Sequence, residues 1–208
     1  MAGLGPEYVI LHAVPLGAGS SDIDHVVIGP TGVFTVNTKN HSGQKVWVAG
    51  NAFMVNGVRQ PYIRNSVFEA RRTAKILTRT MGRPVAVTAM VVVVDPATFT
   101  VKTKPDGVDV ITCRRLLRCI TQGPRVYSAA DVAALVARAQ NPSVWHTAPP
   151  DHGNPGELMT RFKMLRQTVR RARARKRMWG LAGMASIVAI VAVAALNASN
   201  VVELVIGG

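Results

Sequence analysis

The hydrophobic positions of the first 145 residues follow two repeating patterns. Runs of β-branched and aromatic residues predict strands, and Val85–Val94 is so nearly all apolar that we expect it buried on both faces. The other predicted strands are Tyr8–Val14, Gln44–Val48, Ala52–Val55 and Val108–Ile111. Asn65–Met81 places Val67, Ala70, Ala74 and Leu77 at helical spacing, with basic residues between them. Shorter helices are predicted at 113–121 and 129–140, the latter with a capping box at Ser128 and Asp131.

The strongest local pattern is a β-hairpin within residues 22–40. Two β-branched runs flank the tight turn Gly29-Pro30-Thr31-Gly32. Successive side chains of a strand alternate between its faces, so Asn37 and Lys39 share one face and Thr38 points away. Asp24 is expected near the open end of the hairpin, across from the end of the strand that carries Asn37 and Lys39.

An acid and a lysine on one sheet face suit the chemistry of phosphate esters. Mg²⁺ is usually held by one or two carboxylates together with waters and substrate phosphate. Such an ion stabilises charge at phosphorus, and a lysine beside it can orient or deprotonate the attacking water. Asp24 and Lys39 are therefore candidates for a metal-and-phosphate site.

The same residues resemble a known family. Asp24-His25, the turn GP-x-G-V-F and the ending x-T-K-N-H-x-G at Gly43 are similar to the nuclease-related domain (NERD) family, and the similarity extends over about residues 8–145. That family is placed in the PD-(D/E)xK, restriction-endonuclease-like superfamily. The resemblance implies an α/β (α+β) fold, a mixed sheet flanked by helices over residues 1–140, with DNA as a partner and Mg²⁺ as a cofactor.

Matching the family motif gives each position an expected role. Asp24 stands at the metal-binding Asp, Lys39 at the Lys, and the neutral Asn37 where the motif has Glu. Glu69 lies about where the family favours a Gln, early in the following helix. We expect it to serve as the second catalytic carboxylate and metal ligand, or else to pair on the helix surface near Arg72 or Thr73. The N-terminal helix usual in the family is not expected, because the first predicted strand begins at Tyr8.

Several neighbours extend the candidate site. The carbonyl of Thr38 is a further metal ligand in this scheme. His25 and His41 flank the site. Each is expected to act as a base, to contact a phosphate, or to be a structural group held by hydrogen bonds. The basic residues on the helix that follows the hairpin are either phosphate contacts or a solvated face: Arg71, Arg72 and Lys75.

The chain is strongly basic, with a formal net charge of +14. Residues 1–150 contain 16 Lys and Arg against 8 Asp and Glu, and residues 151–208 contain 9 against 3. Both parts therefore suit polyanions, either nucleic acid or an anionic membrane surface. Charge by itself is equally compatible with a solvated basic surface.

The C-terminal quarter predicts a membrane anchor. A Pro- and Gly-rich linker at 141–157 precedes a basic juxtamembrane helix at 158–178. Trp179–Leu196 is 18 residues without a charge, about 27 Å as a helix, which is close to the thickness of a bilayer core. A buried core helix is the alternative. The positive-inside rule predicts a single-pass protein of the cell membrane with a cytoplasmic domain and a short outer tail at 197–208.

Two main functions follow. The first is a membrane-anchored, Mg²⁺-dependent DNA endonuclease using Asp24, Lys39 and Glu69. The second is a non-catalytic module that binds nucleic acid or protein at the membrane. The orientation of Glu69 distinguishes them, because a carboxylate facing the sheet near Asp24 favours the enzyme. A third, structural adaptor would have its site face covered by protein.

Overall fold

A five-stranded mixed sheet forms the centre of the structure, which is a computed structural model describing residues 3–15, 22–145 and 154–206. Its strand order is β1-β2-β3-β7-β9. The antiparallel part consists of β1 (Val9–Pro15), β2 (Asp22–Gly29) and β3 (Gly32–Asn40). On its other edge β3 pairs in parallel with β7 (Val87–Val94), which pairs in parallel with β9 (Val108–Thr112). β3 is thus hydrogen-bonded along both edges.

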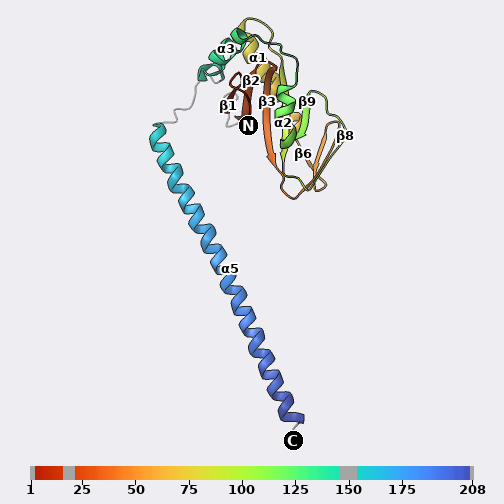
Figure 1. Cartoon of the computed structure of the whole chain (residues 1–208), viewed down its shortest axis with the longest axis vertical. Helices are drawn as coiled ribbons and strands as arrows, with labels where there is room; N and C mark the ends of the chain where they lie inside the picture. The colour runs from red at the N-terminus through yellow and green to blue at the C-terminus, as the bar shows by residue number, and fades with distance from the viewer. Residues whose placement is uncertain (1–2, 16–21, 146–153, 207–208) are drawn as a thin grey trace. The chain divides into compact units, whose positions relative to one another are not determined.

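A smaller, four-stranded sheet lies beside the first one (Figure 1). Its strand order is β6-β5-β4-β8, from β4 (Lys45–Ala49), β5 (Ala52–Val55), β6 (Val58–Gln60) and β8 (Thr98–Thr103). The chain enters it after β3 and leaves it directly into helix α1 (Tyr62–Met81). The small sheet therefore sets the starting point of the helix that carries Glu69.

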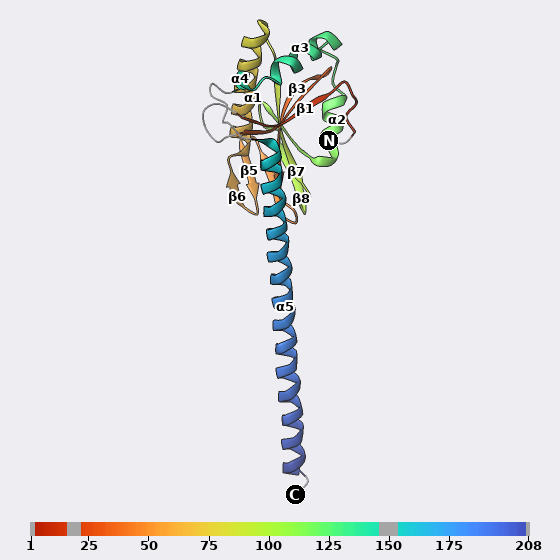
Figure 2. The same cartoon turned by 90° about the vertical axis from the view of Figure 1, so that its left-hand side faces the viewer.

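Helices cover both faces of the central sheet (Figure 2). α1 and α3 (Ala129–Ala139) pack on one face, and α2 (Cys113–Thr121) packs on the other. The strands dictate this arrangement, because alternate apolar side chains of β2 point in opposite directions. Val26 and Ile28 contact the cluster around Leu77 of α1 and Leu135 of α3. Val27 belongs to the cluster that contains the buried residues of α2.

The termini of α1 and α3 follow known capping rules. Gly82 ends α1 with a φ of 68°, in the left-handed region where glycine avoids the strain of a Cβ. At the start of α3 the Ser128 hydroxyl accepts from the Asp131 backbone N–H at 3.1 Å, and the Asp131 carboxylate accepts from the Ser128 N–H at 3.0 Å. This capping box confirms the predicted start of the helix.

The fold confirms the mixed α/β prediction, with mixed sheets flanked by helices. The hairpin, its turn and the helices predicted at 113–121 and 129–140 all form within a residue of the predicted bounds. Sequence analysis missed the short strands β6 and β8 and the helix α4 (Pro142–Trp145). α4 lies inside the predicted linker, and its Trp145 is 5% exposed and packs against the core around Leu77 and Leu135.

The C-terminal part, Pro150–Gly208, is a unit separate from Met1–Pro149. It contains α5 (Pro155–Ile206), which continues through the boundaries predicted at residues 178 and 196 and through most of the predicted tail. In the parts of the chain that the structure describes, no helix combines the length and apolarity needed to cross a membrane. The span predicted at Trp179–Leu196 is therefore not supported, and its side chains at 190–192 and 194–196 lie outside the described residues.

We expect Leu77→Ala to destabilise the protein by about 2–5 kcal/mol, because the side chain of Leu77, on α1, is fully buried against α3 and the sheet. Urea unfolding followed by far-UV circular dichroism measures this change. The matched control is Arg79→Ala, an exposed position in the same helical turn, which should alter stability by less than about 0.5 kcal/mol. Equal effects at the two positions would contradict this packing of α1.

Candidate functional site

The centre of the candidate site is a contact between strand β3 and helix α1. Asn37 is 7% exposed and Glu69 is 9% exposed. The Asn37 side-chain amide, Nδ2, donates to both carboxylate oxygens of Glu69, at 3.1 Å to Oε2 and 3.4 Å to Oε1. Glu69 therefore faces the sheet. Its carboxylate lies against Asn37, the strand position at which the family motif has a Glu and this chain has an amide. The surface pairing of Glu69 with residues on its own helix is not what forms.

Asp24 is held at the open end of the hairpin. Its Oδ2 accepts a hydrogen bond from the backbone N–H of Thr38 at 2.6 Å. The regular β2–β3 pairing ends one residue away, at His25 opposite Val36. The carboxylate thus takes the place of a strand carbonyl, which fixes it next to the backbone between Asn37 and Lys39. The hairpin geometry predicted from the sequence is present.

Lys39 lies beside an aromatic residue that sequence analysis did not single out. Its ammonium nitrogen, Nζ, is 5.4 Å from the centre of the Tyr62 ring, within the range of a cation–π interaction. Tyr62 opens α1 and also stacks on His41, with ring centres 5.7 Å apart. His41 Nδ1 is 2.8 Å from Gln44 Oε1. These contacts restrict Lys39 and make His41 part of the aromatic support beside it.

The electrostatics link Glu69 to the other charged residues. Burial is the main cause of a raised pKa for the Glu69 carboxyl. The hydrogen bond from Asn37 and the positive charge of Lys39 both lower that pKa, while the negative charge of Asp24 raises it further. The charges of Asp24 and Lys39 thus both act on the Glu69 carboxyl. A cation near the carboxylates of Asp24 and Glu69 would offset the free-energy cost of ionising Glu69.

The interface of β3 and α1 concentrates the buried polar side chains of the described residues. Apart from Asn37 and Glu69, these are three hydroxyl residues: Thr35, Ser66 and Thr73. None of the three hydroxyls has a hydrogen-bond partner, and neither has the Asn37 carbonyl oxygen, Oδ1. The sequence signal was available, because Ser66, Glu69 and Thr73 follow at intervals of three and four along α1. These polar positions were not recognised because the apolar residues beside them on the helix were taken as the whole buried face.

Other predicted site residues lie elsewhere. His25 pairs with His12 across β1 and β2, with 2.8 Å between their Nδ1 atoms. Burial, and then the charge of His12, lower the pKa of His25. By strand alternation its side chain is on the sheet face opposite that of Asp24. Arg71, Arg72 and Lys75 are exposed on α1, so the structure leaves them available to solvent.

The donor atoms at the centre suit a hard cation. Among the described residues no three His, Cys, Asp or Glu side chains gather as a metal-binding group. Mg²⁺ does not require three, because it keeps several waters and uses one or two carboxylates. The carboxylates of Asp24 and Glu69 and the free Oδ1 of Asn37 are all oxygen donors. The residues present therefore fit Mg²⁺ or Mn²⁺ better than a softer metal.

Comparison with known proteins agrees with the resemblance read from the hairpin. The family model described as "Nuclease-related domain", NERD, matches residues 3–94. The matched region runs from just before β1 to the end of β7, and it contains Asp24, Asn37, Lys39 and Glu69. Comparisons with curated proteins and with solved structures gave no match.

We expect Glu69→Gln to raise the thermal stability of the metal-free protein at neutral pH. A carboxyl whose pKa is raised on folding favours the folded state below its unfolded pKa, and this stability is lost as pH rises through the folded pKa. Glutamine cannot ionise and still offers Asn37 an acceptor. The measurement is the melting temperature from pH 4 to pH 8 in EDTA, where each 1 kcal/mol corresponds to about 2–4 °C.

Two results sharpen this comparison. The variant should lose less stability than the wild type as pH rises, and the difference should shrink when Mg²⁺ or Mn²⁺ is added. A wild type whose stability instead grows with pH relative to Glu69→Gln would contradict a Glu69 carboxyl whose pKa is raised by burial.

Proposed function

We propose that this chain, whose residues 3–94 match the nuclease-related domain family model, cleaves phosphodiester bonds of DNA in a metal-dependent reaction on a restriction-endonuclease-like fold. The observation that carries this proposal is the contact between Asn37 and Glu69. It supplies, from α1, the second carboxylate that the strand lacks.

The charge balance supports catalysis. A neutral Asn37 alone would leave Asp24 as a single acid, which binds a divalent ion weakly. With Glu69 held 3.1 Å from Asn37 Nδ2, its carboxyl lies close enough to Asp24 and Lys39 for both charges to act on it. Asn37 then has a positioning role, because its amide donates to Glu69 and fixes the direction of the carboxylate.

Each residue has a distinct task in this proposal. Asp24 and Glu69 hold Mg²⁺ or Mn²⁺, with the Thr38 carbonyl as a further donor. The bound ion supplies Lewis-acid stabilisation of charge at the phosphorus centre. Lys39, restrained by Tyr62, donates a hydrogen bond that orients the attacking water. The basic surface of α1, with Arg71, Arg72 and Lys75, attracts the phosphate backbone.

A non-catalytic nucleic-acid- or protein-binding module is the second candidate. It is favoured by one observation: both oxygens of Glu69 already contact Asn37, as in a purely structural hydrogen bond. In that case the buried pair only joins α1 to β3. The two candidates differ in whether metal and activity depend on Asp24 and Lys39.

Plasmid nicking by the full chain with Mg²⁺ or Mn²⁺ tests the proposal. We expect Asp24→Ala, Lys39→Ala and Glu69→Ala each to lower the nicking rate by about 10²- to 10⁴-fold. Lys102→Ala and Glu157→Ala, at exposed positions, are matched controls for charge and should retain the activity.

Equal rates in the wild type and in all three site variants would indicate a contaminating nuclease and contradict catalysis here. A wild type that binds DNA without nicking it would favour the second candidate. The circular dichroism spectrum of each variant confirms that it is folded.

We further propose that α5 anchors the protein to the cell membrane, with the nuclease-related domain in the cytoplasm. Support comes from the uncharged sequence Trp179–Leu196 after the basic stretch, and from large apolar side chains exposed on α5. Trp179 is 73% exposed and Ile187 is 62% exposed, and an exposed apolar surface of this kind needs a partner such as a lipid phase. The preceding arginines suit anionic headgroups.

Cell fractionation tests this anchor. We expect the full chain in the membrane fraction, resistant to a high-salt wash, and a chain lacking residues 178–208 to leave that fraction. Ile187→Lys together with Val188→Lys should weaken the association, since a charged side chain is costly to bury in the apolar phase of a membrane. The matched control replaces both residues by Ala. Full-length protein in the soluble fraction would contradict the anchor.

A further inference from the structure

A cavity lies on the outer side of α1, away from the interface with β3. It has a volume of about 530 Å³ and is lined by residues of α1, of the small sheet and of the loop before β9. Three of its lining residues are arginines: Arg59 on β6, and Arg64 and Arg71 on α1. Asp106 is the single acid that lines it. The cavity therefore has an excess of positive charge.

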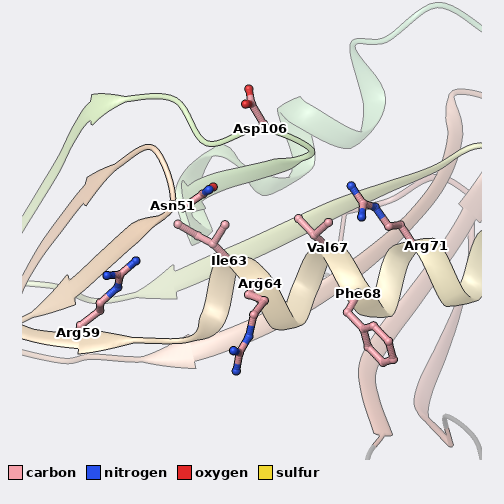
Figure 3. Close-up of a pocket in the computed structure, with 8 residues that line it drawn as sticks. All are labelled: Asn51, Arg59, Ile63, Arg64, Val67, Phe68, Arg71 and Asp106. Carbon is pink, nitrogen blue, oxygen red and sulfur yellow. The ribbon is translucent and has the colours of Figure 1, made fainter.

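The three arginines are available for a ligand. Each is exposed, and none forms an ion pair with any carboxylate that the structure describes. Figure 3 shows that Arg64 points to one side of α1 and Arg71 to the other, with Arg59 at the end of the small sheet. All three arginines line the cavity, Arg71 on the same side of α1 as Ile63 and Val67, and Arg64 on the other side. Exposed arginines in this arrangement suit phosphate groups, which they bind with a planar pair of donors.

The cavity also offers apolar and aromatic surface. Ile63 and Val67 line it beside the arginines, and Phe68 is 59% exposed. Phe68 points to the same side of α1 as Arg64, four residues earlier (Figure 3). Side chains at this spacing have Cβ atoms about 5–6 Å apart. A phosphate on Arg64 and an unstacked base on Phe68 would therefore be neighbouring parts of one nucleotide strand.

We infer that this cavity binds a single-stranded segment of nucleic acid, with phosphates on Arg59, Arg64 and Arg71 and a base stacked on Phe68. Single-strand sites combine these two features, a basic groove and an aromatic platform. A duplex keeps its bases stacked inside, so it would use the arginines and leave Phe68 without a role. The inference rests on the proposed function for the class of ligand. The cavity contains none of Asp24, Lys39 and Glu69, and it shares Arg71 with the basic surface proposed above to attract the phosphate backbone.

Fluorescence anisotropy of the full chain with a labelled 20-nucleotide thymidine oligomer, in EDTA, tests this inference. Cleavage needs a metal and binding here does not, so binding and catalysis can fail separately. Arg64→Gln with Arg71→Gln should weaken binding roughly tenfold or more and lower the salt dependence by about 0.7 per arginine in log–log slope. The matched control, Arg79→Gln with Arg138→Gln, removes the same charge at exposed positions outside the cavity.

The aromatic contact has its own control. Phe68→Ala and Phe68→Leu should weaken binding of the thymidine oligomer roughly 5- to 150-fold. Phe68→Tyr keeps an aromatic ring and should bind the oligomer as the wild type does. An oligomer of the same length without bases should bind the wild type and Phe68→Ala equally. No binding in EDTA, equal losses in the two arginine pairs, or an equal effect of Phe68→Ala on the abasic oligomer would each overturn the inference.

Discussion

The hydrogen bond between Asn37 and Glu69 is the interaction on which the arrangement of the site depends. It joins the middle of β3 to the second turn of α1, inside an interface that combines apolar side chains with the buried hydroxyls of Thr35, Ser66 and Thr73. A buried carboxylate without a donor would be costly, and so would a buried amide without an acceptor. Each group thus makes the other tolerable. The pair therefore helps to set which face of the helix meets the sheet.

Moving the second acid from the strand to the helix changes what the site requires. If β3 carried both acid and lysine, a correctly formed hairpin would suffice to bring the charges together. With Glu69 on α1, the site also depends on the docking of that helix through Ile63, Ala70 and Leu77. The small sheet contributes as well, because it delivers the chain to Tyr62, which contacts both Lys39 and His41. Chemistry and packing are thereby coupled.

The sequence predicted what depends on local periodicity. Alternation along β3 placed Asn37 and Lys39 on one face, and the glycines and proline of the turn placed Asp24 across from them. Whether Glu69 faces the sheet or the solvent depends on how α1 is rotated about its axis when it packs on the sheet. The sequence of the helix did not decide between these two orientations. β6 and β8 are short and largely exposed, so they lack the apolar runs that reveal buried strands. The cavity around Arg59 joins distant segments, which periodicity does not detect.

The double pairing of β3 also limits errors of alignment. A slip of one residue would turn Asn37 and Lys39 towards α2 and present Thr38 to Glu69, because side-chain direction reverses with every step along a strand. β3 is aligned antiparallel to β2 and parallel to β7, with Asn37 opposite Val91 and Lys39 opposite Val93. A slipped strand would have to break both ladders and bury Lys39 among the apolar residues around Ile111 and Leu116. β2 and β7 therefore each fix the register of β3, and together they keep Lys39 and Asn37 on the sheet face that carries Asp24 and meets Glu69.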